Sequence, residues 1–124
     1  MNKLLASRRV LVVEDEMLIV MMIEDMLLDL GCESIVTAGS VDQALAKIEE
    51  QAFDVAMLDS NLNGESSDPI ADALAARGVP FFFATGQKSG GMRHGHPDRP
   101  VLKKPFTFDD LDQSFREMFA SKGE

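Results

Sequence analysis

Short apolar runs alternate with longer segments of helical periodicity along most of this 124-residue chain. The apolar runs are short and rich in branched and aromatic residues, which is typical of buried strands. They cover residues 9–13, 34–38, 53–58, 80–84 and 101–102. Helical spacing predicts helices over 17–30, after Ser40, from Pro69 to Gly78 and after Thr107. Strands that alternate with helices predict a doubly wound α/β fold, a parallel sheet with helices on both faces.

Several helix ends carry their own signals. Gly31 is a natural stop for the first helix, and Ser40 with Gln43 three residues later forms a capping-box pattern. Pro69 suits a first helical turn, and Thr107 is the predicted cap of the last helix. In that last helix, apolar residues recur at the spacing of one buried face, at Leu111, Phe115, Met118 and Phe119.

One helix expected from the alternation is missing. The segment between the last two strands, residues 86–99, is rich in glycine and proline and has almost no apolar periodicity. We predict a loop there, with a reduced or disordered fourth helix. Segments of this kind have low local stability, so we also expect this loop to be mobile in one state of the protein and to become ordered or repositioned in another.

Charge and hydropathy narrow the class of protein. A net charge of −9 and a pI near 4.6 argue against nucleic acid as a direct partner. The longest apolar stretch, residues 17–23, is too short to span a bilayer, and the first residues lack a signal-peptide core. We therefore expect a cytoplasmic protein with no membrane association. The length predicts one domain over residues 1–124, with a core at about 8–120.

Chemically active side chains follow four of the predicted strands. They are Glu14 and Asp15, then Asp59 and Asn61, then Thr85, then Lys104. The carboxyl ends of parallel strands meet at one edge of a sheet, where ligands bind, so these side chains are expected to converge. Lys103 precedes Lys104, and because successive strand side chains point to opposite faces, only one of the two lysines can point at the pocket.

Three carboxylates in one pocket repel one another, and such a cluster either raises the pKa of one of the acids or recruits a cation. Mg²⁺ prefers oxygen ligands and keeps several waters, so Asp15, Asp59 and the backbone carbonyl of Asn61 suffice, with Glu14 reaching through water. An ionised Asp59 is then a nucleophile for phosphorus. Lys104 and Thr85 are suitable donors for the charge that develops on the phosphoryl oxygens.

This combination resembles the bacterial response-regulator receiver domain of two-component signalling, from Arg9 to Ala120. The resemblance implies a flavodoxin-like receiver fold with strand order 2-1-3-4-5. It implies that Asp59 is the phosphoacceptor and that Glu14 and Asp15 are the acidic pair. Asn61 would be a metal ligand through its backbone carbonyl. Thr85 would be the switch hydroxyl, and Lys104, with a cis peptide bond to Pro105, would contact the phosphoryl group.

The function implied by the resemblance is that of a receiver that takes a phosphoryl group from a histidine kinase or histidine phosphotransfer protein. It would need Mg²⁺, would signal by binding a downstream protein or by relaying the group, and would catalyse only its own phosphorylation and slow dephosphorylation. The string from Pro80 to Gly86 contains Phe-Ala-Thr-Gly and resembles a subgroup of mostly single-domain receivers associated with general stress signalling. Like that subgroup, the chain lacks an aromatic residue three positions before Lys104, where it has Val101.

Other interpretations of the same residues stay open. An aspartate-nucleophile phosphatase needs an acid at position 61, where this chain has Asn61. A receiver-like interaction module that is not regulated by phosphorylation would have lost pocket residues, and this chain keeps all of them. His94 and His96 are too few ligands for a closed metal site. The methionines of the first helix, Met17, Met21, Met22 and Met26, are interpreted as flexible core filler, and Cys32 as a small packed residue.

Overall fold

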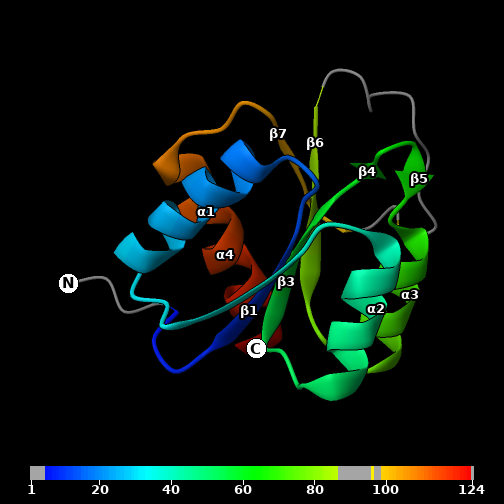
Figure 1. Cartoon of the computed structure of the whole chain (residues 1–124). Helices are drawn as coiled ribbons and strands as arrows, with labels where there is room; N and C mark the ends of the chain where they lie inside the picture. The colour runs from blue at the N-terminus through cyan, green and yellow to red at the C-terminus, as the bar shows by residue number, and fades with distance from the viewer. Residues whose placement is uncertain (1–4, 87–95, 97–98, 124) are drawn as a thin grey trace.

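The central layer of the molecule is a parallel sheet (Figure 1). The computed structural model describes residues 5–86, 96 and 99–123. Within these residues, five strands pair side by side in the order β2-β1-β3-β6-β7. Their bounds are β1 (Arg9–Val13), β2 (Ser34–Ala38), β3 (Val55–Asp59), β6 (Phe81–Thr85) and β7 (Val101–Lys103). Because β6 and β7 are the fourth and fifth strands of the sheet along the chain, the predicted order is confirmed.

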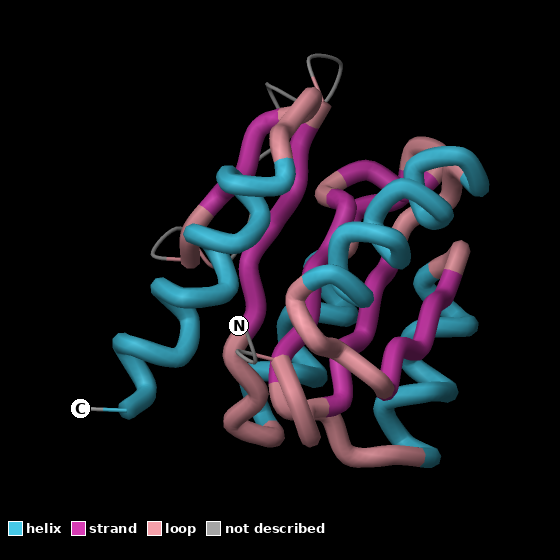
Figure 2. The backbone as a smooth tube through the Cα atoms, turned by 90° about the vertical axis from the view of Figure 1, so that its left-hand side faces the viewer, coloured by secondary structure: helices cyan, strands magenta, loops and turns pink. Residues whose placement is uncertain are grey.

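Two pairs of helices cover the two faces of the sheet (Figures 1 and 2). The helices are α1 (Met17–Asp29), α2 (Val41–Glu50), α3 (Asp68–Ala76) and α4 (Phe108–Gly123). One buried cluster joins α1 and α4 to the sheet and contains Ile23 and Phe115. The other joins α2 and α3 to the opposite face and contains Ile48 and Leu74. The sheet is therefore buried on both sides, as its continuous apolar strands require.

The residues predicted to cap or end helices do so in the structure. The hydroxyl of Ser40 accepts a hydrogen bond from the Gln43 N–H at 3.2 Å. At the start of α4, the Thr107 hydroxyl accepts from the Asp110 N–H, and the Asp110 carboxylate accepts from the Thr107 N–H. Gly31 follows the end of α1 with φ +87°, a conformation that glycine adopts without steric cost. Local chemistry therefore fixes where these helices begin and end.

The third sheet strand is displaced from its predicted position. It runs over Val55–Asp59 instead of 53–58. Asp54 is held at the strand entrance because its carboxylate accepts the Arg9 N–H at 2.7 Å and its own N–H donates to the Arg9 carbonyl. At the far end, the Ser60 N–H donates to the Ala84 carbonyl, so the ladder continues through Asp59.

The interpretation of the α1 methionines as core filler is wrong for three of the four. Met17, Met21 and Met22 are exposed by 69%, 53% and 39%, while Met26 packs partly against the core. The helix is buried through its other side, at Val20, Ile23 and Leu27. A helix with apolar residues nearly all round gives no periodicity from which to tell its buried side.

A small antiparallel hairpin follows β3 and was not predicted. It consists of β4 (Asn61–Leu62) and β5 (Glu65–Ser66), with Leu62 paired to Glu65. The two turn residues, Asn63 and Gly64, have φ +54° and +90°. Asn-Gly between two strands is a strong signal for this type of two-residue turn.

The predictions for residues 86–99, a reduced fourth helix and a switching loop, fall almost entirely outside the described residues, as does His94. Of this segment, the structure describes Gly86, His96 and Arg99. The His96 Nε2 atom lies 2.8 Å from the Asp72 carboxylate, and the histidine ring packs edge-on against Phe81. Among the described helices, none has the length and apolar character to cross a membrane.

Candidate functional site

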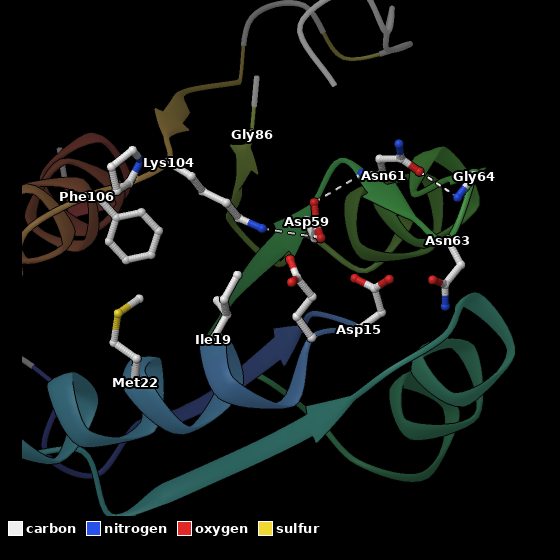
Figure 3. Close-up of a pocket in the computed structure, with 12 residues that line it drawn as sticks. Asp15, Ile19, Met22, Asp59, Asn61, Asn63, Gly64, Gly86, Lys104 and Phe106 are labelled. Carbon is white, nitrogen blue, oxygen red and sulfur yellow. Dashed lines mark hydrogen bonds and ion pairs between the residues drawn. The ribbon is translucent and has the colours of Figure 1, made fainter. Parts of the chain in front are cut away.

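Three carboxylates meet at the carboxyl edge of the sheet, as predicted (Figure 3). Glu14 directly follows β1 and stays in the ladder because its N–H donates to the Ala38 carbonyl. Asp15 comes next, and Asp59 is the last residue of the neighbouring strand β3. One carboxylate oxygen from each of the three lies within 4.8 Å of the others. Glu14 and Asp59 are buried, and Asp15 is half-buried.

Lys104 provides a positive charge in this cluster. Its Nζ donates to Glu14 Oε1 at 2.7 Å and lies 3.4 Å from Asp59 Oδ2. Lys103 is exposed instead, so Lys104 is the one of the two that points at the cluster, as the resemblance implied. The Lys104 N–H donates to the Thr85 carbonyl at 2.8 Å, and the peptide bond to Pro105 is cis, as the resemblance implied.

Burial controls the electrostatics of the cluster. It raises the pKa of Glu14 to about 7, against the hydrogen bond from Lys104. Burial also raises the pKa of Asp59, against the hydrogen bond from Asn61 and the charge of Lys104. Burial alone would lower the pKa of Lys104, but the hydrogen bond to Glu14 and the charge of Asp59 outweigh it and raise that pKa. Three acids facing one ammonium leave an excess of negative charge that a dication can neutralise.

The carboxylate oxygens suit a hard divalent cation such as Mg²⁺. Two of the three acids are buried, the donor atoms are all oxygens, and they are close enough to share one ion. Mg²⁺ keeps several of its waters, so the three acids need supply only part of its ligands.

The cluster forms one wall of an open pocket of about 1030 Å³. The second wall comes from the β4–β5 hairpin at Asn61, Asn63 and Gly64. The third wall is apolar and comes from α1 and the segment before α4, at Ile19, Met22, Pro105 and Phe106. Figure 3 shows the hairpin wall and the apolar wall on opposite sides of the acids.

Of the other two predicted site residues, Asn61 lines the pocket and Thr85 does not. The Asn61 N–H donates to Asp59 Oδ1 at 3.2 Å, and the Asn61 side chain lies in the hairpin wall. Thr85 ends β6, next to the strand that carries Asp59, but it is not among the residues that line the pocket. Asn63, Glu16 and the apolar wall were not anticipated. The Asn-Gly turn signal would have located Asn63, whereas no local sequence pattern marks the apolar wall.

The fold and the pocket together define a doubly wound α/β domain with an acidic cluster and a lysine at the carboxyl ends of its strands. The chain belongs to the response regulator receiver domain family, whose model matches residues 10–116. No curated protein sequence matches it.

Solved structures give more particular relatives. The solution structure of SdrG from Sphingomonas melonis Fr1 is 45% identical, with a TM-score of 0.82 over 90% of this chain and 96% of that one. A BeF₃-activated conformation of SdrG from Pseudomonas melonis Fr1 is also 45% identical, with a TM-score of 0.76 over 90% and 95% of the two chains. The receiver domain of the response regulator PhyR from Erythrobacter litoralis is 27% identical, with a TM-score of 0.79 over 93% and 92%.

Proposed function

We propose that this protein is a phosphoacceptor receiver that takes a phosphoryl group on Asp59 from a histidine kinase or a histidine phosphotransfer protein. The observation that carries the proposal is the position of Asp59. It is a buried carboxylate at the end of the central strand, 3.4 Å from the Lys104 ammonium and within reach of two further acids. Beyond transferring and slowly losing its own phosphoryl group, the protein is proposed to catalyse no reaction.

The acidic cluster is proposed to bind Mg²⁺. Asp15 and Asp59 would bind it directly together with the Asn61 carbonyl, and Glu14 would act through water, because Lys104 already occupies its Oε1 atom at 2.7 Å. When bound, this ion would neutralise charge on the phosphoryl oxygens.

The transfer itself needs a nucleophile and a donor of positive charge. An oxygen of ionised Asp59 forms a bond to phosphorus while the bond from phosphorus to the donor histidine nitrogen breaks. Lys104 then stabilises the negative charge on the phosphoryl group from its place beside Asp59. Thr85 is proposed as a second donor, from the end of the strand next to Asp59.

The surface next to the pocket favours a helical protein as the donor. Met17, Leu18 and Met21 of α1 expose 69%, 81% and 53% of their surface. They adjoin Ile19 and Met22 of the same helix, which line the pocket. A partner helix packed along α1 would cover these residues and bring its phosphohistidine to the pocket mouth.

The relatives suggest a direction for the output. One solved relative, PhyR from Bartonella quintana, is described as an anti-anti-sigma factor, and this chain spans about half of it at 25% identity. Together with the Phe-Ala-Thr-Gly string, this supports a role in stress signalling for the present protein, through a downstream protein target.

Phosphorylation of purified protein tests the proposal. The wild type is mixed with phosphoramidate, a small phosphoryl donor, and Mg²⁺, and its intact mass is measured. We expect one added phosphoryl group on the wild type and none on Asp59→Asn. Asp42→Asn is a matched control, because it removes an exposed aspartate from the start of α2, near the same sheet edge. A fully labelled Asp59→Asn protein would show that the acceptor lies elsewhere, and an unlabelled wild type would favour an interaction module that is not regulated by phosphorylation.

A further inference from the structure

The tip of the β4–β5 hairpin places a polar side chain in the pocket wall. Asn63 lines the pocket together with Gly64, although its backbone has the positive φ that most residues avoid. In Figure 3 its carboxamide projects beside the carboxylate of Asp15, on the opposite side of the acids from Lys104. The carboxamide therefore faces the part of the cluster that carries no positive charge in the described structure.

Two hydrogen bonds hold this tip in register with Asp59. The Asn61 N–H donates to Asp59 Oδ1 at 3.2 Å, and the Asn61 side-chain oxygen accepts from the Gly64 N–H at 2.7 Å. The hairpin pairing of Leu62 with Glu65 closes the turn between them. The hairpin that carries Asn63 is thus tied to the Asp59 carboxylate through Asn61, and its turn is closed by the bond between Asn61 and Gly64.

We propose that Asn63 is a positioning residue for the divalent cation, and that its carboxamide oxygen accepts a hydrogen bond from a water molecule bound to that ion. Mg²⁺ keeps several of its waters when it binds to proteins, and each of these waters is a strong donor that needs an acceptor. Asp15 and Asn63 both line the pocket, and Figure 3 shows the carboxamide on the side of the Asp15 carboxylate, so a water bound to an ion at Asp15 would have this carboxamide as an acceptor. This inference rests on the proposed binding of Mg²⁺ at Asp15 and Asp59.

The turn by itself also favours asparagine at this position, because asparagine tolerates a positive φ. Glycine tolerates the same φ equally well and has no side chain. Asn63→Gly therefore keeps the turn and removes the carboxamide, which separates a role toward the ion from a role in folding. Asn63→Asp also suits the turn and adds a negative charge at the same point.

Calorimetric titration of metal-free protein with Mg²⁺ tests the inference. We expect Asn63→Gly to raise the Kd by about 2- to 10-fold, the range for one hydrogen bond, and Asn63→Asp to lower it. Glu65→Gln is the control, because Glu65 is exposed on the same hairpin and does not line the pocket. Its Kd should stay close to that of the wild type. Thermal unfolding of each variant without metal verifies that the fold is kept.

The possible outcomes are distinct. A wild-type Kd for Asn63→Gly, with the wild type itself binding Mg²⁺, overturns the inference and leaves the proposed function standing. Unchanged Mg²⁺ affinity with weaker binding of beryllofluoride, a phosphoryl mimic, also overturns it, because Asn63 would then contact the phosphoryl group. A wild type that does not bind Mg²⁺ overturns this inference together with the metal part of the proposed function.

Discussion

Glu14 is a buried acid that holds Lys104 beside Asp59. Its Oε1 atom accepts from the ammonium at 2.7 Å, and its Oε2 atom accepts from the Glu16 N–H at 3.2 Å. Both carboxylate oxygens therefore accept hydrogen bonds within the protein, whereas those of Asp15 make no hydrogen bond or ion pair with the residues that the structure describes. The acidic pair is thus divided, with Glu14 orienting the lysine and Asp15 open to the pocket.

The raised pKa of Glu14 predicts a pH-dependent stability in metal-free protein. The folded state holds the Glu14 proton up to about pH 7, whereas the ordinary value is 4.5. The stabilisation from this proton is complete below pH 4.5 and is lost as the pH rises through 7. The free energy of unfolding should therefore fall over this window, by up to about 3 kcal/mol from Glu14.

Urea unfolding in the presence of a chelator, at intervals from pH 4.5 to 7.5, measures this dependence. Glu14→Gln should remove much of the slope, and the remainder should come from Asp59, whose pKa is shifted in the same direction. A variant with the full wild-type slope would contradict the assignment to Glu14.

The division of the acidic pair predicts unequal contributions to Mg²⁺ binding. Asp15→Asn removes the charge of a proposed direct ligand, so we expect its Kd to rise at least about tenfold. Glu14→Gln should cost less, because the proposed contact of Glu14 with the ion runs through water. Titrations of both variants give the two values, and equal affinity of Asp15→Asn and wild type would rule out Asp15 as a direct ligand.

The sequence located most of the site because strand ends are visible as patterns. The acids, Asp59 and Lys104 all follow apolar runs, so the parallel sheet alone predicts that they converge. Thr85 was assigned to the pocket by the same rule, but the rule places only the strand end and not the direction of the side chain. Asn63 was missed because its place depends on the hairpin that follows β3.

At the scale of elements, the cap of α4 shows how local chemistry fixes a boundary near the site. Thr107 and Asp110 exchange two hydrogen bonds at 3.0 and 3.1 Å, so two backbone N–H groups at the helix start are satisfied. The helix that they begin packs Leu111 and Phe115 into the core. The segment from Lys104 to Phe106 lies directly before this cap and lines the pocket.

Removing the cap should destabilise the protein. We expect Thr107→Ala to lower the free energy of unfolding by about 1 kcal/mol, within the range for lost N-caps. Thr107→Ser keeps the hydroxyl and should stay close to the wild type. Equal stability of the alanine and serine variants in chemical denaturation would show that the hydroxyl contributes nothing.

At the scale of the whole molecule, the alternation of strands and helices was sufficient to predict the sheet and its order. This alternation could not predict two features of the structure. The hairpin strands have two residues each, which is too short for any periodicity to appear. The outward side of α1 could not be identified either, because Met21 and Leu28 have the same apolar character as the buried Ile23 and Leu27.

The exposed methionines of α1 make the molecule's surface chemically distinguishable from its core. Peroxide converts accessible thioethers to sulfoxides, and Met17 and Met21 are open to it, whereas Met57 and Met118 are 1% and 6% exposed. We expect peptide mass spectrometry to show rapid oxidation of the first pair and slow oxidation of the second. Comparable rates at Met57 and Met17 would contradict this arrangement of α1. Sulfoxides are polar, so oxidation of these methionines should also weaken binding of the proposed phosphoryl donor along α1. Phosphorylation of the protein by that donor would then be sensitive to oxidants.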